Sequence, residues 1–110
     1  MDFHDYQQCI EECLRCAAIC SHCAAACLQE DDVQDMSVCI QLNFECAAVC
    51  KAAADVMSLG GQYAHPLYQI CVQMCNLCAE ECAKHAIEHC RECAEACRQC
   101  AGECANMVAA

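Results

Sequence analysis

The sequence is poor in basic residues and has no long apolar run and no recognisable secretory signal. Five Lys and Arg stand against sixteen Asp and Glu, for a formal net charge of −11. This deficit excludes the positive surface that nucleic acids and anionic lipids require. No stretch approaches the roughly 18 apolar residues of a transmembrane helix, and the acidic start Met1–Asp5 does not resemble a secretory signal. We therefore expect a cytoplasmic protein that binds neither nucleic acid nor membrane.

Large apolar side chains are also scarce. Leu, Ile, Val and Phe number 19 of 110 residues, and with the strong net charge this composition approaches that of disordered chains. The chain is instead rich in cysteine and alanine, with 18 and 20 residues respectively. Its length suits one domain over residues 1–110. Such a domain folds only if the cysteines themselves form the core.

The cysteines recur at the spacing of one helical face. In three clusters they are three or four residues apart, and no Gly or Pro lies between those of the first cluster. The remaining three, Cys39, Cys46 and Cys50, are seven and four residues apart. Every one falls at an inward heptad position. The inward cysteines, which are also the candidate metal ligands, are Cys9, Cys13, Cys16, Cys20, Cys23, Cys27, Cys39, Cys46, Cys50, Cys71, Cys75, Cys78, Cys82, Cys90, Cys93, Cys97, Cys100 and Cys104.

The first half of the chain predicts two helices. The first runs from about Asp5 to Leu28, with Asp5 and Gln8 spaced like a capping box. A turn at 29–32 follows, and its acidic residues suit the N-terminus of the second helix. That helix should end near Leu59, because the glycine pair at 60–61 provides a C-terminal stop.

The second half predicts two more helices. Pro66 suits the first turn of the third helix, where its missing N–H costs nothing. The cysteine phase then slips by one residue, which places a tight turn within Lys84–His89. Short connections favour antiparallel neighbours. The predicted fold is therefore all-α, an antiparallel up-down-up-down four-helix bundle with a cysteine-lined core.

Three chemical interpretations of such a core can be compared. A dry thiol core would pack poorly, because small side chains leave voids. Disulfides are disfavoured between neighbours on one helix and do not persist in the reducing cytosol. Metal binding remains. Four thiolates on each zinc ion would bury excess negative charge, whereas Cu(I), a soft monovalent ion, prefers thiolates and leaves the filled core near neutral.

These cysteine stripes resemble those of the copper storage proteins, a family of cysteine-lined four-helix bundles, over about residues 5–107. The resemblance implies cytosolic storage of many Cu(I) ions per protomer, in a homotetramer and without turnover. It leaves open whether a copper chaperone delivers the metal. The alternatives are a metallothionein-like Zn or Cd buffer and a thiol–disulfide redox protein. An enzyme has less support, because no Ser/His/Asp set, phosphate loop or paired carboxylates in a cleft are evident.

The ends of the predicted bundle differ in composition. One end collects acidic residues and three further candidate ligands, Met36, His85 and His89, of which the histidines could equally be solvated turn residues. The resemblance implies that histidines at an open mouth form outer copper sites, so we expect copper to enter there. The other end collects an expected apolar plug of Phe3, Tyr6, Ile10, Met57, Tyr63, Leu67, Tyr68 and Met107.

The remaining polar candidates have less specific roles. Asn43 occupies an inward position, where its carbonyl could contact copper or its amide could form hydrogen bonds across the channel. His22 lies between Cys20 and Cys23 on an outward phase, which predicts a surface role. The other two histidines, His4 and His65, are expected to be structural or exposed at the end opposite the mouth.

Overall fold

The protein is described by a computed structural model over residues 3–109, with side chains through Met107. Met1, Asp2 and Ala110, which the predicted domain includes, lie outside the described residues. Within the described part there is no β-strand. The elements are helices α1 (Phe3–Cys27), α2 (Ser37–Leu59), α3 (Ala64–Cys82) and α4 (Glu88–Ala109), with a short 3-10 helix, η1 (Val33–Met36), before α2.

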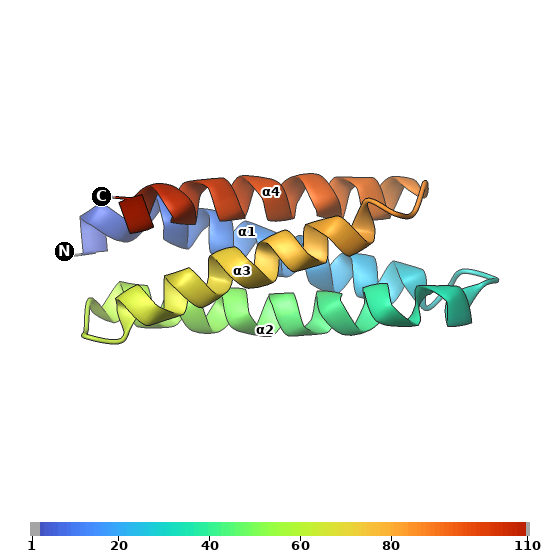
Figure 1. Cartoon of the computed structure of the whole chain (residues 1–110). Helices are drawn as coiled ribbons and strands as arrows, with labels where there is room; N and C mark the ends of the chain where they lie inside the picture. The colour runs from blue at the N-terminus through green and yellow to red at the C-terminus, as the bar shows by residue number, and fades with distance from the viewer. Residues whose placement is uncertain (1–2, 110) are drawn as a thin grey trace.

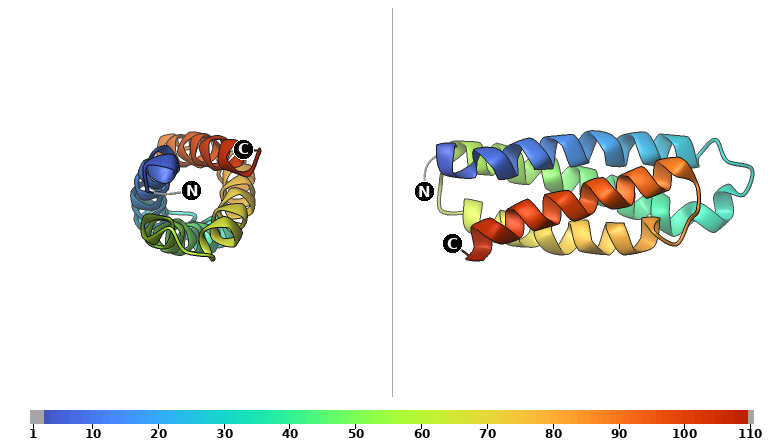
Figure 2. Two further views of the ribbon diagram at one scale, coloured as in Figure 1. Left: turned by 90° about the vertical axis from the view of Figure 1, so that its left-hand side faces the viewer. Right: turned by 90° about the horizontal axis from the view of Figure 1, so that it is seen from above.

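The helices form an antiparallel four-helix bundle, as predicted (Figure 1). α1 packs against α2 and α4, and α3 packs against the same two helices. Viewed along its length, the bundle has the four helices arranged around one axis (Figure 2). It extends 46 Å along this axis and 19 by 17 Å across. None of the helices within residues 3–109 has the length and apolar character needed to cross a membrane.

The two ends of the bundle carry different parts of the chain. The α1–α2 and α3–α4 connections meet at one end, which we call the histidine end and define by residues 28–36 and 83–89. Both termini and the α2–α3 connection lie at the other end, the terminal end, defined by residues 3–10, 57–68 and 104–107 (Figure 1). This division is the one that the predicted topology implies.

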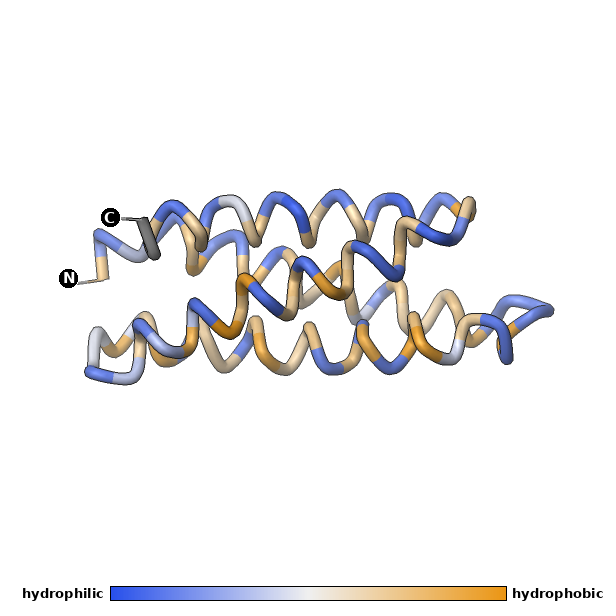
Figure 3. Tube along the Cα trace, viewed as in Figure 1, coloured by the Kyte–Doolittle hydropathy of each residue, from blue (hydrophilic) through white to orange (hydrophobic). Residues whose placement is uncertain are grey.

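The core consists of cysteine with alanine beside it. All eighteen cysteines have no exposed surface, so the predicted inward phase is confirmed. Hydrophilic residues recur along the outer edge of α4 (Figure 3). Six alanines that directly follow a cysteine in sequence are buried as well, where small side chains let neighbouring helices approach: Ala17, Ala24, Ala47, Ala79, Ala94 and Ala101. Ala83 and Ala105, which also follow a cysteine, are exposed.

Two of the predicted helix starts differ from the structure. α1 already includes Phe3, so Asp5 lies inside the first turn and cannot be the N-cap of a capping box. The second helix begins only at Ser37, because η1 precedes it. The acidic residues of the turn therefore precede η1 rather than α2, and the Asp32 side chain makes no capping hydrogen bond there. η1 brings Met36 into the core, where it is fully buried.

The other predicted boundaries are close to those observed. α3 contains Pro66 in its first turn and ends at Cys82. The break before α4 spans residues 83–87, so His89 lies within α4 rather than in the turn. The chain leaves α3 in a turn with two hydrogen bonds of 3.1 Å: Lys84 N–H donates to Glu81 O, and His85 N–H donates to Cys82 O.

α2 ends where the glycine pair predicted a stop, and this generates a stability prediction. Gly60 has φ 67° and ψ 21°, in the left-handed region, and its N–H donates to Met57 O. Gly60→Ala should lower the free energy of unfolding by about 1 kcal/mol, because Cβ disfavours this conformation. Urea unfolding of the reduced protein measures the change.

Gly61→Ala is the matched control for this substitution. A Cβ at Gly61 would meet no atom within 4 Å, and the only positive-φ glycine among the described residues is Gly60. The control should unfold at the urea concentration of the unmodified protein or slightly above it. Equal destabilisation by the two substitutions would contradict the role assigned to Gly60.

Candidate metal centre

The cysteine sulfurs form a continuous column along the bundle axis. Several sets of four sulfurs, contributed by different helices, lie within 4.8 Å of one another. Neighbouring sets share members, since Cys16, Cys20, Cys46 and Cys97 each belong to two. From the histidine end to the terminal end, these sets include Cys23, Cys27, Cys39 and Cys90; Cys20, Cys78, Cys93 and Cys97; Cys16, Cys20, Cys46 and Cys97; Cys16, Cys46, Cys50 and Cys75; and Cys13, Cys71, Cys100 and Cys104.

The sulfur spacing matches that of ligands sharing a metal ion. A metal–thiolate bond of about 2.3 Å places two sulfurs on one ion roughly 3.8 Å apart at a tetrahedral angle. The observed separations include 3.7 Å between Cys16 and Cys97 and 3.6 Å between Cys50 and Cys75. Soft ions could therefore bind along the column without large movement of the helices, and shared sulfurs could bridge adjacent sites.

Asn43 is the one buried polar side chain that is not a cysteine among the residues with described side chains. Its Oδ1 accepts hydrogen bonds from the thiols of Cys93 at 3.1 Å and Cys78 at 3.2 Å. Its Nδ2 donates to Cys39 Sγ at 3.5 Å. Of the two roles predicted for Asn43, the structure contains the hydrogen bonds across the channel. The amide thereby joins α2, α3 and α4.

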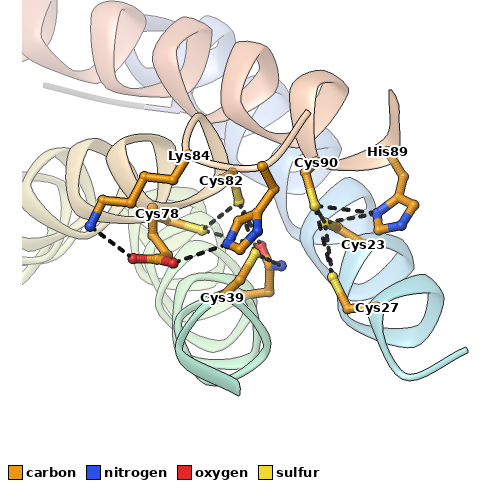
Figure 4. A network of polar contacts seen from close by, with 11 residues as sticks. Cys23, Cys27, Cys39, Cys78, Cys82, Lys84, His89 and Cys90 are labelled. Carbon is orange, nitrogen blue, oxygen red and sulfur yellow. Dashed lines mark hydrogen bonds and ion pairs between the residues drawn. The ribbon is translucent and has the colours of Figure 1, made fainter. Parts of the chain in front are cut away.

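His89 faces the sulfur column at the histidine end (Figure 4). Its Nδ1 lies 3.4 Å from Cys23 Sγ and 3.6 Å from Cys90 Sγ. Its Nε2 lies 3.1 Å from Glu30 Oε1. The predicted inward position of His89 is thus observed, and the ring bridges the thiols and an acidic side chain of the α1–α2 connection.

The other two candidates at this end have different surroundings. His85 is mostly buried, and its Nε2 lies 3.1 Å from Glu81 Oε2, one helical turn earlier in the sequence. Met36 has no exposed surface and lies in the same core cluster as Cys39. The structure therefore brings Met36, His85 and His89 to one end of the column, as their sequence positions predicted.

The thiols nearest this end differ in how readily they ionise. Burial raises the pKa of Cys27 and of Cys90, because a thiolate is poorly solvated there. Hydrogen bonds from Cys23 and then Cys82 lower the pKa of Cys39 to about 3, with a further contribution from the nearby His85. Among these three thiols, Cys39 is the one most easily deprotonated.

The terminal end is closed by a smaller plug than predicted. Tyr6, Ile10, Met57 and Tyr68 are buried, and the two tyrosine rings lie 6.0 Å apart. The Tyr68 hydroxyl donates to the Met107 carbonyl at 3.4 Å. Leu67 and Met107 pack against this core as partly buried residues. The expected members Phe3 and Tyr63 are wrong: they are 44% and 64% exposed, because each lies on the outer side of its segment.

One pair of cysteines forms a disulfide, which the sequence analysis did not expect. Cys9 and Cys104 are joined between α1 and α4, with a Cα–Cα distance of 5.2 Å. The argument against neighbours on one helix does not apply, because these residues face each other from adjacent helices. The other sixteen cysteines are free thiols. In this disulfide form, Cys9 and Cys104 offer no thiolate to a metal, so their predicted ligand role requires reduction.

The remaining histidines lie away from the column. His22, His4 and His65 are all exposed, as predicted. His65 makes an edge contact with the Tyr68 ring, with the ring centroids 4.9 Å apart. These three side chains are therefore not among the groups that face the buried sulfurs.

The sequence analysis did not single out two carboxylates that contact His85 and His89 at the histidine end. Glu81 precedes His85 by four residues, a helical spacing that could have indicated their contact. Glu30 lies 59 residues from His89, and no local pattern links them. Their pairing depends on how the two connections meet in the folded bundle.

Comparison with known proteins shows the family to which the chain belongs. The profile of the copper storage proteins matches residues 2–109. The chain belongs to the copper storage protein family. No curated protein matches it.

Solved copper storage proteins share the fold closely. A cytosolic copper storage protein from Streptomyces lividans, loaded with five coppers, is 44% identical with a TM-score of 0.94 over 99% of this chain and 96% of that chain. The form loaded with ten copper equivalents is 46% identical, with a TM-score of 0.89 over 93% and 82% of the two chains. The Cu(I)-bound protein BsCsp3 of Bacillus subtilis is 37% identical, with a TM-score of 0.89 over 93% and 96%.

The disulfide predicts how many thiols this copper storage protein exposes on unfolding. Under denaturing, non-reducing conditions, a colorimetric thiol assay should count 16 of the 18 cysteines, and all 18 after reduction. Cys104→Ala should give 17 in both assays, because Cys9 then has no partner. A count of 18 without reduction in the unmodified protein would contradict the disulfide.

Proposed function

We propose that the chain stores many Cu(I) ions on the thiolates of its core. The observation that carries this proposal is the continuous column of buried sulfurs at ligand spacing. Membership of the copper storage family supports it, as do the copper-loaded relatives. The whole chain would serve as one copper-binding domain, and its cargo would be limited by the number of reduced thiols.

The chemistry of the column favours Cu(I) over a divalent ion. Thiolates suit soft ions, and a monovalent ion balances roughly one thiolate charge. Zinc or cadmium in thiolate sites would leave the column strongly negative, and buried excess charge is costly. Within residues 3–107 no Lys or Arg side chain is buried to compensate such charge. This argument makes a Zn or Cd buffer the weaker function.

We propose no catalytic step for this protein. A thiol–disulfide redox protein would present one or two accessible, easily ionised cysteines beside a resolving partner. Here all eighteen cysteines are fully buried. Buried thiolates instead suit the retention of Cu(I) ions, so the function would be storage and sequestration.

Copper is proposed to enter at the histidine end. There His85, His89 and Met36 would act as outer ligands, since imidazole and thioether groups both bind copper. His89 is poised for this role because its Nδ1 faces the thiols of Cys23 and Cys90. At the terminal end, the core is covered instead by the buried tyrosines Tyr6 and Tyr68.

Membership of the family supports a proposal about where the protein acts and how it assembles. We propose a cytosolic protein that assembles as a homotetramer of bundles. Exposed apolar side chains on the outer surfaces of α2 and α3, such as Val38, Phe44 and Leu77, are available to contacts between copies. A copper chaperone that delivers the ions would be a further partner.

The storage function is tested by an anaerobic titration. Fully reduced protein is titrated with Cu(I) against a chromophoric Cu(I) chelator. Uptake should approach one Cu(I) per thiol, because neighbouring sites share sulfurs. Saturation after only a few ions, or displacement of bound copper by zinc, would reject storage of Cu(I).

The role of His85 and His89 at the histidine end is tested by replacing both. Replacing both residues, as His85→Phe with His89→Phe, should slow Cu(I) loading and chelator-driven removal by about tenfold, as expected when ligands to a site are lost. Total capacity should fall little, because the thiols remain. Stopped-flow absorbance during loading measures the rate.

His22→Phe is the control for the double substitution. It makes the same chemical change at an exposed histidine away from the column. Its loading and removal rates should match those of the unmodified protein. If the double variant also keeps the unmodified rates, His85 and His89 have no role in copper passage.

A further inference from the structure

The contact between Glu30 and His89 joins two distant parts of the chain. Glu30 lies in the connection that follows α1, and His89 lies in the first turn of α4. Their side chains meet at 3.1 Å across a sequence separation of 59 residues. The contact therefore holds the α1–α2 connection against the start of α4 at the histidine end.

The chemistry of this contact sets which ring nitrogen faces the thiols. A carboxylate can only accept a hydrogen bond, so His89 Nε2 carries the hydrogen that it donates to Glu30. Nδ1, the other nitrogen, lies 3.4 Å from Cys23 Sγ and 3.6 Å from Cys90 Sγ. In the neutral ring, Nδ1 then presents its lone pair to these two thiols (Figure 4).

Glu30 is also placed to limit the motion of the ring. The His89 side chain is 14% exposed, and that of Glu30 is 33% exposed, so the contact is partly shielded from water. Removing the carboxylate would restore rotation about the histidine side-chain bonds and remove the preference of Nε2 for the hydrogen. The effect would act on His89 rather than on the thiols directly.

The second histidine of this end has a different arrangement. The partner of His85 is Glu81, which lies only four residues earlier in the sequence. Glu81 also contacts Lys84 Nζ at 3.3 Å. Glu30, in contrast, comes from a separate connection, and His89 is the ion-pair partner that the structure gives it. Glu30 is thus the more specific probe of how histidine orientation affects metal uptake.

We propose that Glu30 is a positioning residue for copper uptake, holding His89 across the mouth with Nδ1 directed at Cys23 and Cys90. The proposal rests on the proposed function. Carboxylates behind metal-binding histidines orient the ring and raise its basicity, and their loss commonly costs ten- to a hundred-fold in affinity or activity. Glu30 itself need not touch the ion.

A competing explanation treats Glu30 only as negative charge that attracts a cation. Asp31, Asp32 and Asp35 lie in the same connection and are exposed. If general attraction is the mechanism, any of these carboxylates should matter about as much as Glu30. If positioning is the mechanism, the effect of Glu30 should depend on the presence of His89.

The first experiment compares Cu(I) uptake in five reduced proteins: unmodified, Glu30→Ala, Asp31→Ala, His89→Phe and the Glu30→Ala/His89→Phe double variant. Glu30→Ala should slow the initial phase of uptake by about tenfold and leave final capacity unchanged. Asp31→Ala, which removes the same charge from the same turn, should have little effect. The double variant should load at the rate of His89→Phe alone.

The second experiment observes the metal-free protein directly. Long-range ¹H–¹⁵N spectra, recorded at mildly alkaline pH, distinguish which ring nitrogen of His89 carries hydrogen. The unmodified protein should give a signal with hydrogen on Nε2 and an unprotonated Nδ1. Glu30→Ala should shift these signals toward those of a freely rotating, solvated histidine, and Glu30→Gln, whose amide oxygen still accepts a hydrogen bond, should retain most of the original pattern and uptake rate.

Specific outcomes would overturn the proposal. One is equal slowing by Glu30→Ala and Asp31→Ala, and another is slowing by Glu30→Ala that persists in the His89→Phe background. An unchanged His89 spectrum in Glu30→Ala would also contradict it. Failure of the proposed function differs from all three, because the unmodified protein itself would then bind only a few Cu(I) ions. Circular dichroism of each variant checks that the bundle is intact.

Discussion

The bundle depends on one packing constraint: most inward positions must hold a sulfur atom, and the core must still exclude water. Cysteine and alanine are small, so the helices must approach closely for their side chains to fill the interior. Larger apolar residues such as Ile19, Val49 and Val72 are only partly buried and pack around the sulfur column. The scarcity of large apolar residues is therefore a requirement of this architecture, because bulky inward side chains would occupy the space of the ligands.

The constraint also explains why the polar exceptions are few and specific. Asn43 replaces a thiol at an inward position and satisfies its amide by hydrogen bonds with thiols from three helices. At the histidine end, the ring of His89 continues the line of donor atoms towards the surface. At the terminal end, the line stops at the buried rings of Tyr6 and Tyr68. The polar groups thus follow the axis instead of being scattered through the core.

The sequence predicted those features that depend on local periodicity. The spacing of the cysteines, three or four residues in three helices and seven then four in the second, predicted the inward face of each helix. Gly60 and Pro66 marked helix ends correctly. The start of the second helix was missed because η1 has no distinct sequence signal. Contacts between distant residues were also missed: the Cys9–Cys104 disulfide spans 95 residues and the Glu30–His89 contact spans 59. Such pairings depend on the relative register of helices, which spacing along one helix does not determine.

The difference between the two ends of the column has a consequence for the order in which ions are exchanged. The tyrosines seal the terminal end, with Tyr68 further tied to the Met107 carbonyl. If copper enters and leaves only at the histidine end, as proposed above, the ions are released in the reverse of the order in which they were loaded. The ions that settled deepest would be the last to leave, while those near His89 would form a readily exchanged fraction. One chain would then hold both a short-term and a long-term reserve of the same metal.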